Sequence, residues 1–134
     1  MIGLDTNVLV RYLTQDDARQ SAIATRLIEN GLNVATPGFI SLVVLVELCW
    51  VLKRLYGATE LELIDTATDL LASARFQVES RAVVQAAVQR MRTPKSKGGL
   101  TDHLIVEIAK TQGCTHTVSF DKAAVRSAGM RLLA

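Results

Sequence analysis

Apolar runs along the chain alternate with polar or glycine-containing breaks, and this pattern predicts short strands separated by helices. Brief apolar runs bounded by turn residues predict five strands, at residues 1–4, 34–35, 76–78, 115–118 and 130–133. Longer segments with apolar residues at helical spacing predict helices at residues 8–13, 16–30, 41–56, 59–73, 81–91, 102–111 and 121–128. Because strands and helices alternate, we predict an α/β fold: a three-layer α/β/α sandwich with a central, mostly parallel five-stranded sheet.

Residue types at the segment ends support the predicted helices. Ser41 and Gly57 flank residues 41–56 as a capping serine and a terminating glycine do. Asp16 and Thr101 are predicted to cap the helices that follow them. On the helix of residues 16–30, the predicted inward face is Ala22, Ile23, Leu27 and Ile28.

Residues 42–52, LVVLVELCWVL, contain ten apolar residues and one charged residue, Glu47. A helix that is apolar around its circumference is expected to be packed on most sides. A buried, ionised Glu47 would lose much of its hydration energy unless it were paired, hydrogen-bonded or bound to a metal ion. The helix alone leaves two interpretations open: a structural carboxylate paired with an internal Arg or facing a groove, and a functional residue.

Three further acids fall at positions where a parallel sheet binds ligands, near the carboxyl ends of its strands. Asp5 follows the first predicted strand, Asp121 follows the fourth, and Asp102 begins the helix that leads into the fourth. Taken singly, Asp5 suits an Asx turn, Asp102 the positive end of a helix dipole, and Asp121 an N-cap. Taken together with Glu47, four clustered acids would repel one another without a cation.

Carboxylate oxygens without a His or Cys cluster favour Mg²⁺ or Mn²⁺ over zinc. One or two such ions best support phosphodiester hydrolysis, by activating a water molecule and stabilising the leaving oxygen. An aspartyl-phosphate enzyme with Asp5 as nucleophile is a second possibility. It is disfavoured because Asn7 stands where that chemistry usually has a second Asp.

Four segments, IGLDTNVLVRYL, VELCWVLKRLYG, LTDHLIVEIAKTQGC and VSFDKAA, together resemble the PIN-domain ribonucleases, and among them the VapC-type toxins of toxin–antitoxin pairs. The resemblance implies an acidic metal site made of Asp5, Glu47, Asp102 and Asp121, with Asn7 and Ser119 as supporting polar residues. Ser119 stands where the family has Thr or Ser, and His103 where it often has a small residue.

This resemblance implies a metal-dependent endoribonuclease that hydrolyses RNA phosphodiester bonds by a metal-activated water. It also implies a homodimer, and a small antitoxin protein whose tail lies across the active site. The alternative is a catalytically inactive PIN-like module that binds RNA or protein. The complete set of acids argues against it, since a degenerate member is expected to have lost at least one.

Length and charge limit these hypotheses without deciding between them. The 134 residues suffice for a single domain, residues 1–134, with one core. A net charge of +2 means that RNA binding must come from a local patch. Arg92, Lys95 and Lys97, around the loop TPKSKGG, are candidate RNA-binding residues, although such a run is usually only a solvated loop. Arg11 suits either a phosphate or antitoxin contact or an ordinary surface helix.

The remaining signals concern location and the few aromatic residues. Cys49 and Cys114 form no disulfide framework, which favours a reducing compartment and buried thiols. The N-terminus has no signal-peptide pattern, and the longest apolar run, residues 39–52, is short for a membrane span. We therefore expect a cytoplasmic protein. Trp50 and Tyr56 are predicted to be core or interface residues rather than base-stacking platforms.

Overall fold

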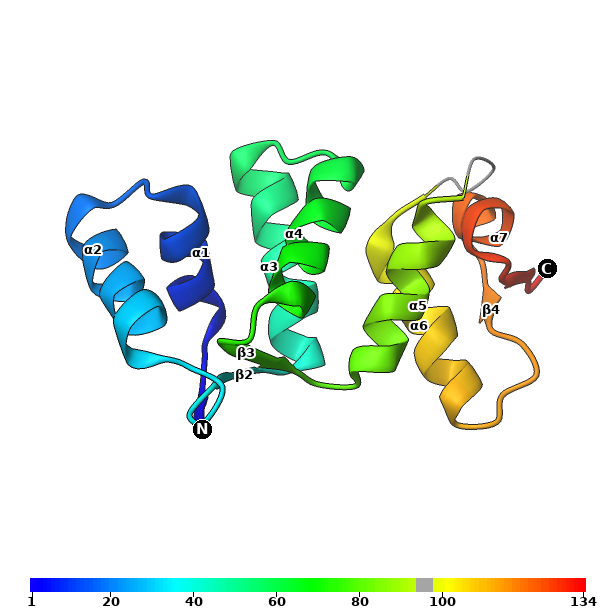
Figure 1. Cartoon of the computed structure of the whole chain (residues 1–134). Coiled ribbons are helices and arrows are strands. Elements are labelled where there is room, and N and C mark those ends of the chain that lie inside the picture. The colour runs from blue at the N-terminus through cyan, green and yellow to red at the C-terminus, as the bar shows by residue number, and fades with distance from the viewer. Residues whose placement is uncertain (94–97) are drawn as a thin grey trace. The chain divides into compact units, whose positions relative to one another are not determined.

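The computed structural model describes residues 1–93 and 98–134, and its elements form a mixed α/β structure that is mostly helical. Contacts divide the chain into two compact parts (Figure 1). The first part contains Met1–Thr59 and Asp69–Arg81, and the second contains Glu60–Thr68 and Ala82–Ala134. Helix α4 (Glu60–Ala72) contributes residues to both parts.

The first part is built on a parallel sheet of three short strands, in the order β1-β2-β3. Its elements are β1 (Ile2–Gly3), α1 (Thr6–Thr14), α2 (Ala18–Arg26), a π-helical turn (Leu27–Gly31), β2 (Gly38–Ile40), α3 (Leu42–Tyr56) and β3 (Phe76–Val78). The Leu4 N–H donates to the Phe39 carbonyl at 2.9 Å and continues the β1–β2 ladder. Asp5 therefore leaves the sheet at the carboxyl end of β1.

The second part has its own two-stranded parallel sheet and a small apolar cluster. Its other elements are α5 (Arg81–Met91, whose first residue belongs to the first part), α6 (Leu100–Thr111), β4 (Val118–Ser119), α7 (Lys122–Ala128) and β5 (Arg131–Leu132). Ala124 and Ala128 of α7 pack with Val106 of α6 and with Met130. Five strands are present among the described residues and all pair in parallel, but as three plus two rather than as one five-stranded sheet, and one of them lies away from its predicted position.

The best-marked helices have the predicted bounds. Ser41 caps α3 by accepting the Val44 N–H at 3.1 Å, and Gly57 ends that helix with a φ of 67°. Helix α5 spans the predicted residues, with Val84 and Val88 buried as expected. Strand β3 also has the predicted bounds.

The predicted second strand at residues 34–35 is wrong. The Asn33 side-chain oxygen accepts the N–H groups of Ala35 at 2.8 Å and Thr36 at 3.0 Å, which makes an Asx turn at this place. Val34 is exposed, and β2 begins only after Pro37. A β-branched residue thus lies in a turn because the preceding Asn satisfies the local backbone.

Two predicted helix caps are also wrong. Asp17, not Asp16, caps α2, with its carboxylate accepting the Gln20 N–H at 2.8 Å. The buried side chains here are Ser21 and Ala24 of α2 and Ile28 of the π-helical turn, so Ile28 is buried as predicted, while Ala22 and Ile23 are exposed. Gly99, not Thr101, occupies the N-cap position of α6.

Helix α3 is buried on one side only, which corrects the expectation that it is packed on most sides. Leu45, Leu48, Cys49 and Leu52 are buried. On another side, Val43 is 78% exposed and Trp50 is 58% exposed, with the Arg54 guanidinium 5.7 Å from the Trp50 ring centre. Trp50 is therefore not a core residue.

A further correction concerns Cys114, which is exposed, whereas Cys49 is buried as predicted. Among residues 1–93 and 98–134, no helix is both long and apolar enough to cross a membrane.

Candidate active site

Asp5 occupies the N-cap position of α1, but its carboxylate does not cap the helix. Its backbone is extended there, with φ −82° and ψ 160°, and only its carbonyl accepts the Val8 N–H, at 3.2 Å. No side-chain hydrogen bond or ion pair joins Asp5 to another described residue. The Asx-turn alternative therefore receives no support, and both carboxylate oxygens are available to a ligand.

Glu47 is exposed on α3, so the argument that its burial demands compensation is wrong. It lies one helical turn after Val43 and nearly one turn before Trp50, and thus on the exposed side of this helix. No ion pair joins Glu47 to the described cations. Among the described residues, Glu47 is therefore not paired with an internal Arg, which was the structural interpretation of this carboxylate.

Asp5 and Glu47 line the same hollow of about 250 Å³ in the first part, which we call the acidic hollow. Its lining consists of Asp5, Thr6, Asn7, Val10, Arg11, Glu47, Val51, Leu55 and Tyr56. The structure thus brings together three of the predicted metal-site and supporting residues, Asp5, Asn7 and Glu47, with Arg11 and Tyr56 in the same lining. All come from the ends of elements around β1 or from the facing side of α3.

Thr6 also lines the acidic hollow and carries a buried polar atom that the sequence did not reveal. Its side chain is only 5% exposed, and its hydroxyl has no hydrogen-bond partner among the described residues. Burying a hydroxyl without a hydrogen-bond partner costs free energy, so such a group is usually hydrogen-bonded to water or bound to an ion. Its place between Asp5 and Asn7 is the only sequence signal that pointed to it.

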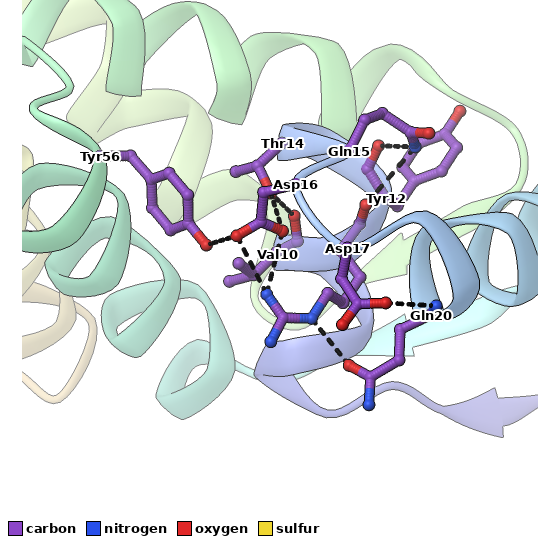
Figure 2. A network of polar contacts seen from close by, with 9 residues as sticks. Val10, Tyr12, Thr14, Gln15, Asp16, Asp17, Gln20 and Tyr56 are labelled. Carbon is purple, nitrogen blue, oxygen red and sulfur yellow. Dashed lines mark hydrogen bonds and ion pairs between the residues drawn. The ribbon is translucent and has the colours of Figure 1, made fainter.

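A network of polar contacts borders the acidic hollow, as Figure 2 shows around Asp16. Arg11 Nη1 donates to the two Asp16 oxygens at 3.0 and 3.2 Å, and Arg11 Nε donates to Gln20 at 2.7 Å. The Thr14 hydroxyl donates to Asp16 at 3.0 Å, and the Tyr56 hydroxyl donates to its other oxygen. Asp16, predicted to be a helix cap, is instead the acceptor on which these groups converge.

These contacts shift two pKa values. The hydrogen bond from Tyr56 is the largest effect on Asp16 and lowers the pKa of its carboxyl below the ordinary value, against desolvation and with help from Thr14 and Arg11. Desolvation acts to lower the pKa of Arg11, but the neighbouring Asp16 and Tyr56 outweigh it and raise that pKa overall. Both groups therefore stay charged at neutral pH.

The other two predicted acids belong to the second part. Asp102 lies half-buried in the first turn of α6, beside the buried His103. Asp121 is the N-cap of α7: one oxygen, Oδ1, accepts the N–H groups of Ala123 at 2.8 Å and Ala124 at 3.4 Å. Its own N–H donates to the Ser119 hydroxyl at 3.0 Å. Asp121 thus performs the structural role considered for it and keeps Oδ2 available.

The donor set of the first part fits a hard divalent cation. Mg²⁺ is usually held by one or two carboxylates and keeps several waters, and the residues that line the acidic hollow include two acids, Asp5 and Glu47, and the polar residues Thr6 and Asn7. In neither part do residues 1–93 and 98–134 include a group of three His, Cys, Asp or Glu side chains placed to hold a metal ion.

The candidate RNA-binding residues near the loop have different outcomes. Arg92 forms an ion pair with Asp65 at 3.1 Å and donates to the Thr68 hydroxyl at 3.1 Å, so its guanidinium fastens the end of α5 to α4. Lys95 and Lys97 lie outside the described residues.

Comparison with known families confirms the resemblance at the level of the family. The model of the PIN domain matches residues 2–129, and so spans both parts of the chain. A comparison with curated proteins finds no similar sequence. Because the match covers nearly the whole chain, the protein belongs to the PIN domain family, whose members are typically nucleases.

Proposed function

We propose that the protein is a metal-dependent endoribonuclease that hydrolyses RNA phosphodiester bonds with one or two Mg²⁺ or Mn²⁺ ions. The observation that carries this proposal is the uncommitted carboxylate of Asp5, which shares the acidic hollow with Glu47 in a chain of the PIN family. Two carboxylates that line one hollow repel each other and also repel the RNA backbone. A bound cation would neutralise them and allow RNA to approach.

In this proposal Asp5, Glu47, Asp102 and Asp121 hold the metal. When bound, the metal would activate a water molecule for attack on the phosphorus and stabilise the leaving oxygen. The chain's own residues set the positions: the end of β1 fixes Asp5, and α3 presents Glu47 from a rigid helix. The α7 cap holds Asp121 by one oxygen, while Ser119 fixes the backbone before it. Asn7 supports the site from the lining of the hollow.

The proposal includes the three-layer sandwich with a single five-stranded sheet in one domain. If β1 and β4 are neighbours in such a sheet, their carboxyl ends lie side by side, and acids from both parts of the chain meet at one metal. Iron-dependent cleavage of the protein backbone tests whether both parts contribute to one metal site. Fe²⁺ with ascorbate and peroxide cleaves backbone near its binding site, so cuts near Asp5 and near both Asp102 and Asp121 are expected. Cuts confined to the first part would refute the shared site.

The activity itself is tested with purified protein and labelled single-stranded RNA. We expect cleavage with Mg²⁺ or Mn²⁺, none with EDTA, and product ends that carry a 5′-phosphate. Asp5→Ala and Asp102→Ala should abolish cleavage, whereas Asp69→Ala, which removes an exposed acid from α4, should not. Full activity in either of the first two variants would sink the assignment, as would cyclic phosphate ends. RNA binding without cleavage would instead support the inactive module.

We further propose that the protein is a VapC-type toxin, cytoplasmic and homodimeric, neutralised by a small cognate antitoxin. Exposed apolar side chains offer surface for both partners: Ile23 on α2, Leu61 on α4 and Val43 on α3. Induction of the protein alone should arrest growth, and joint expression of the protein encoded beside it should restore growth. Light scattering of the purified protein should give the mass of a dimer. Unimpaired growth, together with active ribonuclease in the cells, would refute the toxin role while leaving the nuclease proposal intact.

A further inference from the structure

Among the described residues that line the acidic hollow, Arg11 is the only one with a cationic side chain. It also lines a neighbouring hollow of about 230 Å³, whose other lining residues are Asn7, Val8, Gln20, Ile23, Ala24 and Leu27. Asn7 and Arg11 belong to both hollows. An extended ligand that continues from one hollow into the other would therefore pass Arg11.

The guanidinium of Arg11 is held in place from two directions. Gln20 accepts from Nε at 2.7 Å, and Asp16 accepts from Nη1 with both oxygens. Asp16 is itself fixed by the hydroxyls of Thr14 and Tyr56, which Figure 2 shows pointing at its carboxylate. The side chain keeps 30% of its surface exposed. A planar group fixed in this way loses little further freedom when it binds a ligand.

The third nitrogen of the guanidinium, Nη2, takes part in none of the bonds to Asp16 and Gln20. Its N–H groups are the donors that could meet an anion, in a hollow whose acids would repel that anion unless a metal neutralised them. Arg is well suited to a phosphate because its donors match the spacing of two phosphate oxygens. A purely structural Arg11 would explain the bonds to Asp16 and Gln20, but not why the side chain borders both hollows.

We propose that Arg11 binds a phosphate of single-stranded RNA next to the acidic hollow, and that Asp16, Gln20 and Tyr56 are positioning residues that orient its guanidinium. This inference rests on the proposed ribonuclease function and adds a substrate-binding residue to it. The ion pair with Asp16 fixes the direction of the guanidinium without occupying all of its donors.

The test measures affinity for a fluorescent single-stranded RNA in Mg²⁺ at several salt concentrations, in an Asp102→Asn background to prevent cleavage. Arg11→Gln should weaken binding about tenfold or more, as expected for a lost hydrogen bond to a charged group. It should also reduce the slope of log affinity against log salt by about 0.7, the value for one lost phosphate contact. Asp16→Asn and Tyr56→Phe, which keep the cation but loosen it, should weaken binding less and leave the slope unchanged.

A folded Arg11→Gln variant with the parent slope would overturn the inference, and so would an Asp16→Asn variant with the same loss of slope as Arg11→Gln. If Arg11→Gln does not fold, Arg11→Lys provides the test. It should keep the slope and lose affinity several-fold. An Arg11→Lys variant that binds RNA as tightly as the parent would overturn the role assigned to the guanidinium. If Arg11→Gln leaves RNA binding unchanged and the protein with Asp102 intact cleaves the RNA, only this inference is overturned. No RNA binding by any variant, the parent included, would overturn it together with the proposed function.

Discussion

The four acids differ in how much they contribute to the stability of the fold, so mutations can separate effects on stability from effects on activity. Asp121 caps α7 through Oδ1, whereas Asp5 stands at the N-cap of α1 without capping it. Replacing either by Ala removes a carboxylate proposed to hold the metal. Only Asp121→Ala also removes a hydrogen-bond acceptor from a helix N-terminus.

The expected size of the difference follows from the cap. Loss of an N-cap side chain typically costs about 0.5–2 kcal/mol. Unfolding entropy of roughly 2.1 cal/mol/K per residue gives about 0.28 kcal/mol/K for a chain of this length, so the melting temperature of Asp121→Ala should fall by about 2–7 °C. Because α7 packs on α6 through Ala124 and Ala128, fraying of its first turn loosens this cluster as well. Asp5→Ala should shift the melting temperature by less than about 2 °C, since substitutions away from such contacts usually change stability by less than about 0.5 kcal/mol.

Calorimetry and cleavage assays on three variants decide the matter. Asp121→Asn keeps a side-chain oxygen that can cap the helix, and should melt near the parent temperature while losing cleavage. Asp121→Ala should lose both stability and cleavage, and Asp5→Ala only cleavage. The reasoning is refuted if Asp5→Ala destabilises as much as Asp121→Ala, or if Asp121→Asn melts as low as Asp121→Ala.

Two further predictions concern the surroundings of the acidic hollow. Gly38→Ala should destabilise the protein by about 1–3 kcal/mol through overpacking, because the added Cβ would lie 2.6 Å from Leu4 Cδ1. Gly3→Ala on the paired strand is the control: its Cβ meets nothing within 4 Å, and its stability should not change. Equal melting temperatures of the two variants would contradict this prediction. Since the folded pKa of Asp16 is lowered, its stabilising effect is present above about pH 4, the unfolded value, and is lost as pH falls through the folded pKa. The stability difference between the parent and Asp16→Asn should accordingly shrink in denaturant titrations below pH 4, and a difference independent of pH would refute the assignment.

Elements with both a periodic pattern and a terminal signal were predictable from the sequence. Helix α3 has apolar residues throughout, a serine before it and a glycine after it, and these local signals fix its ends without help from distant residues. Strand β3 and helix α5 are similarly well marked. Where two neighbouring residues compete for one role, as Asp16 and Asp17 do for the cap of α2, the local pattern cannot choose. Contacts with Arg11 and Tyr56 make the choice, and Tyr56 is 40 residues away.

Asp5 and Glu47 were predicted from the sequence to lie close together and do line one hollow, although the reason given for Glu47 was wrong, while Asp102 and Asp121 belong to the second part. Glu47 was singled out because burial seemed to require a partner for it, and it is exposed. It still shares the acidic hollow with Asp5, because α3 begins directly after β2 and β2 pairs with β1. Thr6, Arg11 and Tyr56 complete the lining, and their contributions depend on long-range packing that hydrophobic periodicity does not encode.

Fold and function are therefore linked through the sheet. The β1–β2 pairing places the end of β1 beside the start of α3, and Asp5 and Glu47 line one hollow there. The same logic extends to Asp102 and Asp121 only if β4 joins that sheet, because one of these acids follows β4 and the other begins the helix before it. Backbone cleavage by iron in both parts would thus support the five-stranded sheet as well as the metal site. Cleavage in the first part alone would instead require a nuclease centre built on Asp5 and Glu47, and Asp102→Ala should then retain activity.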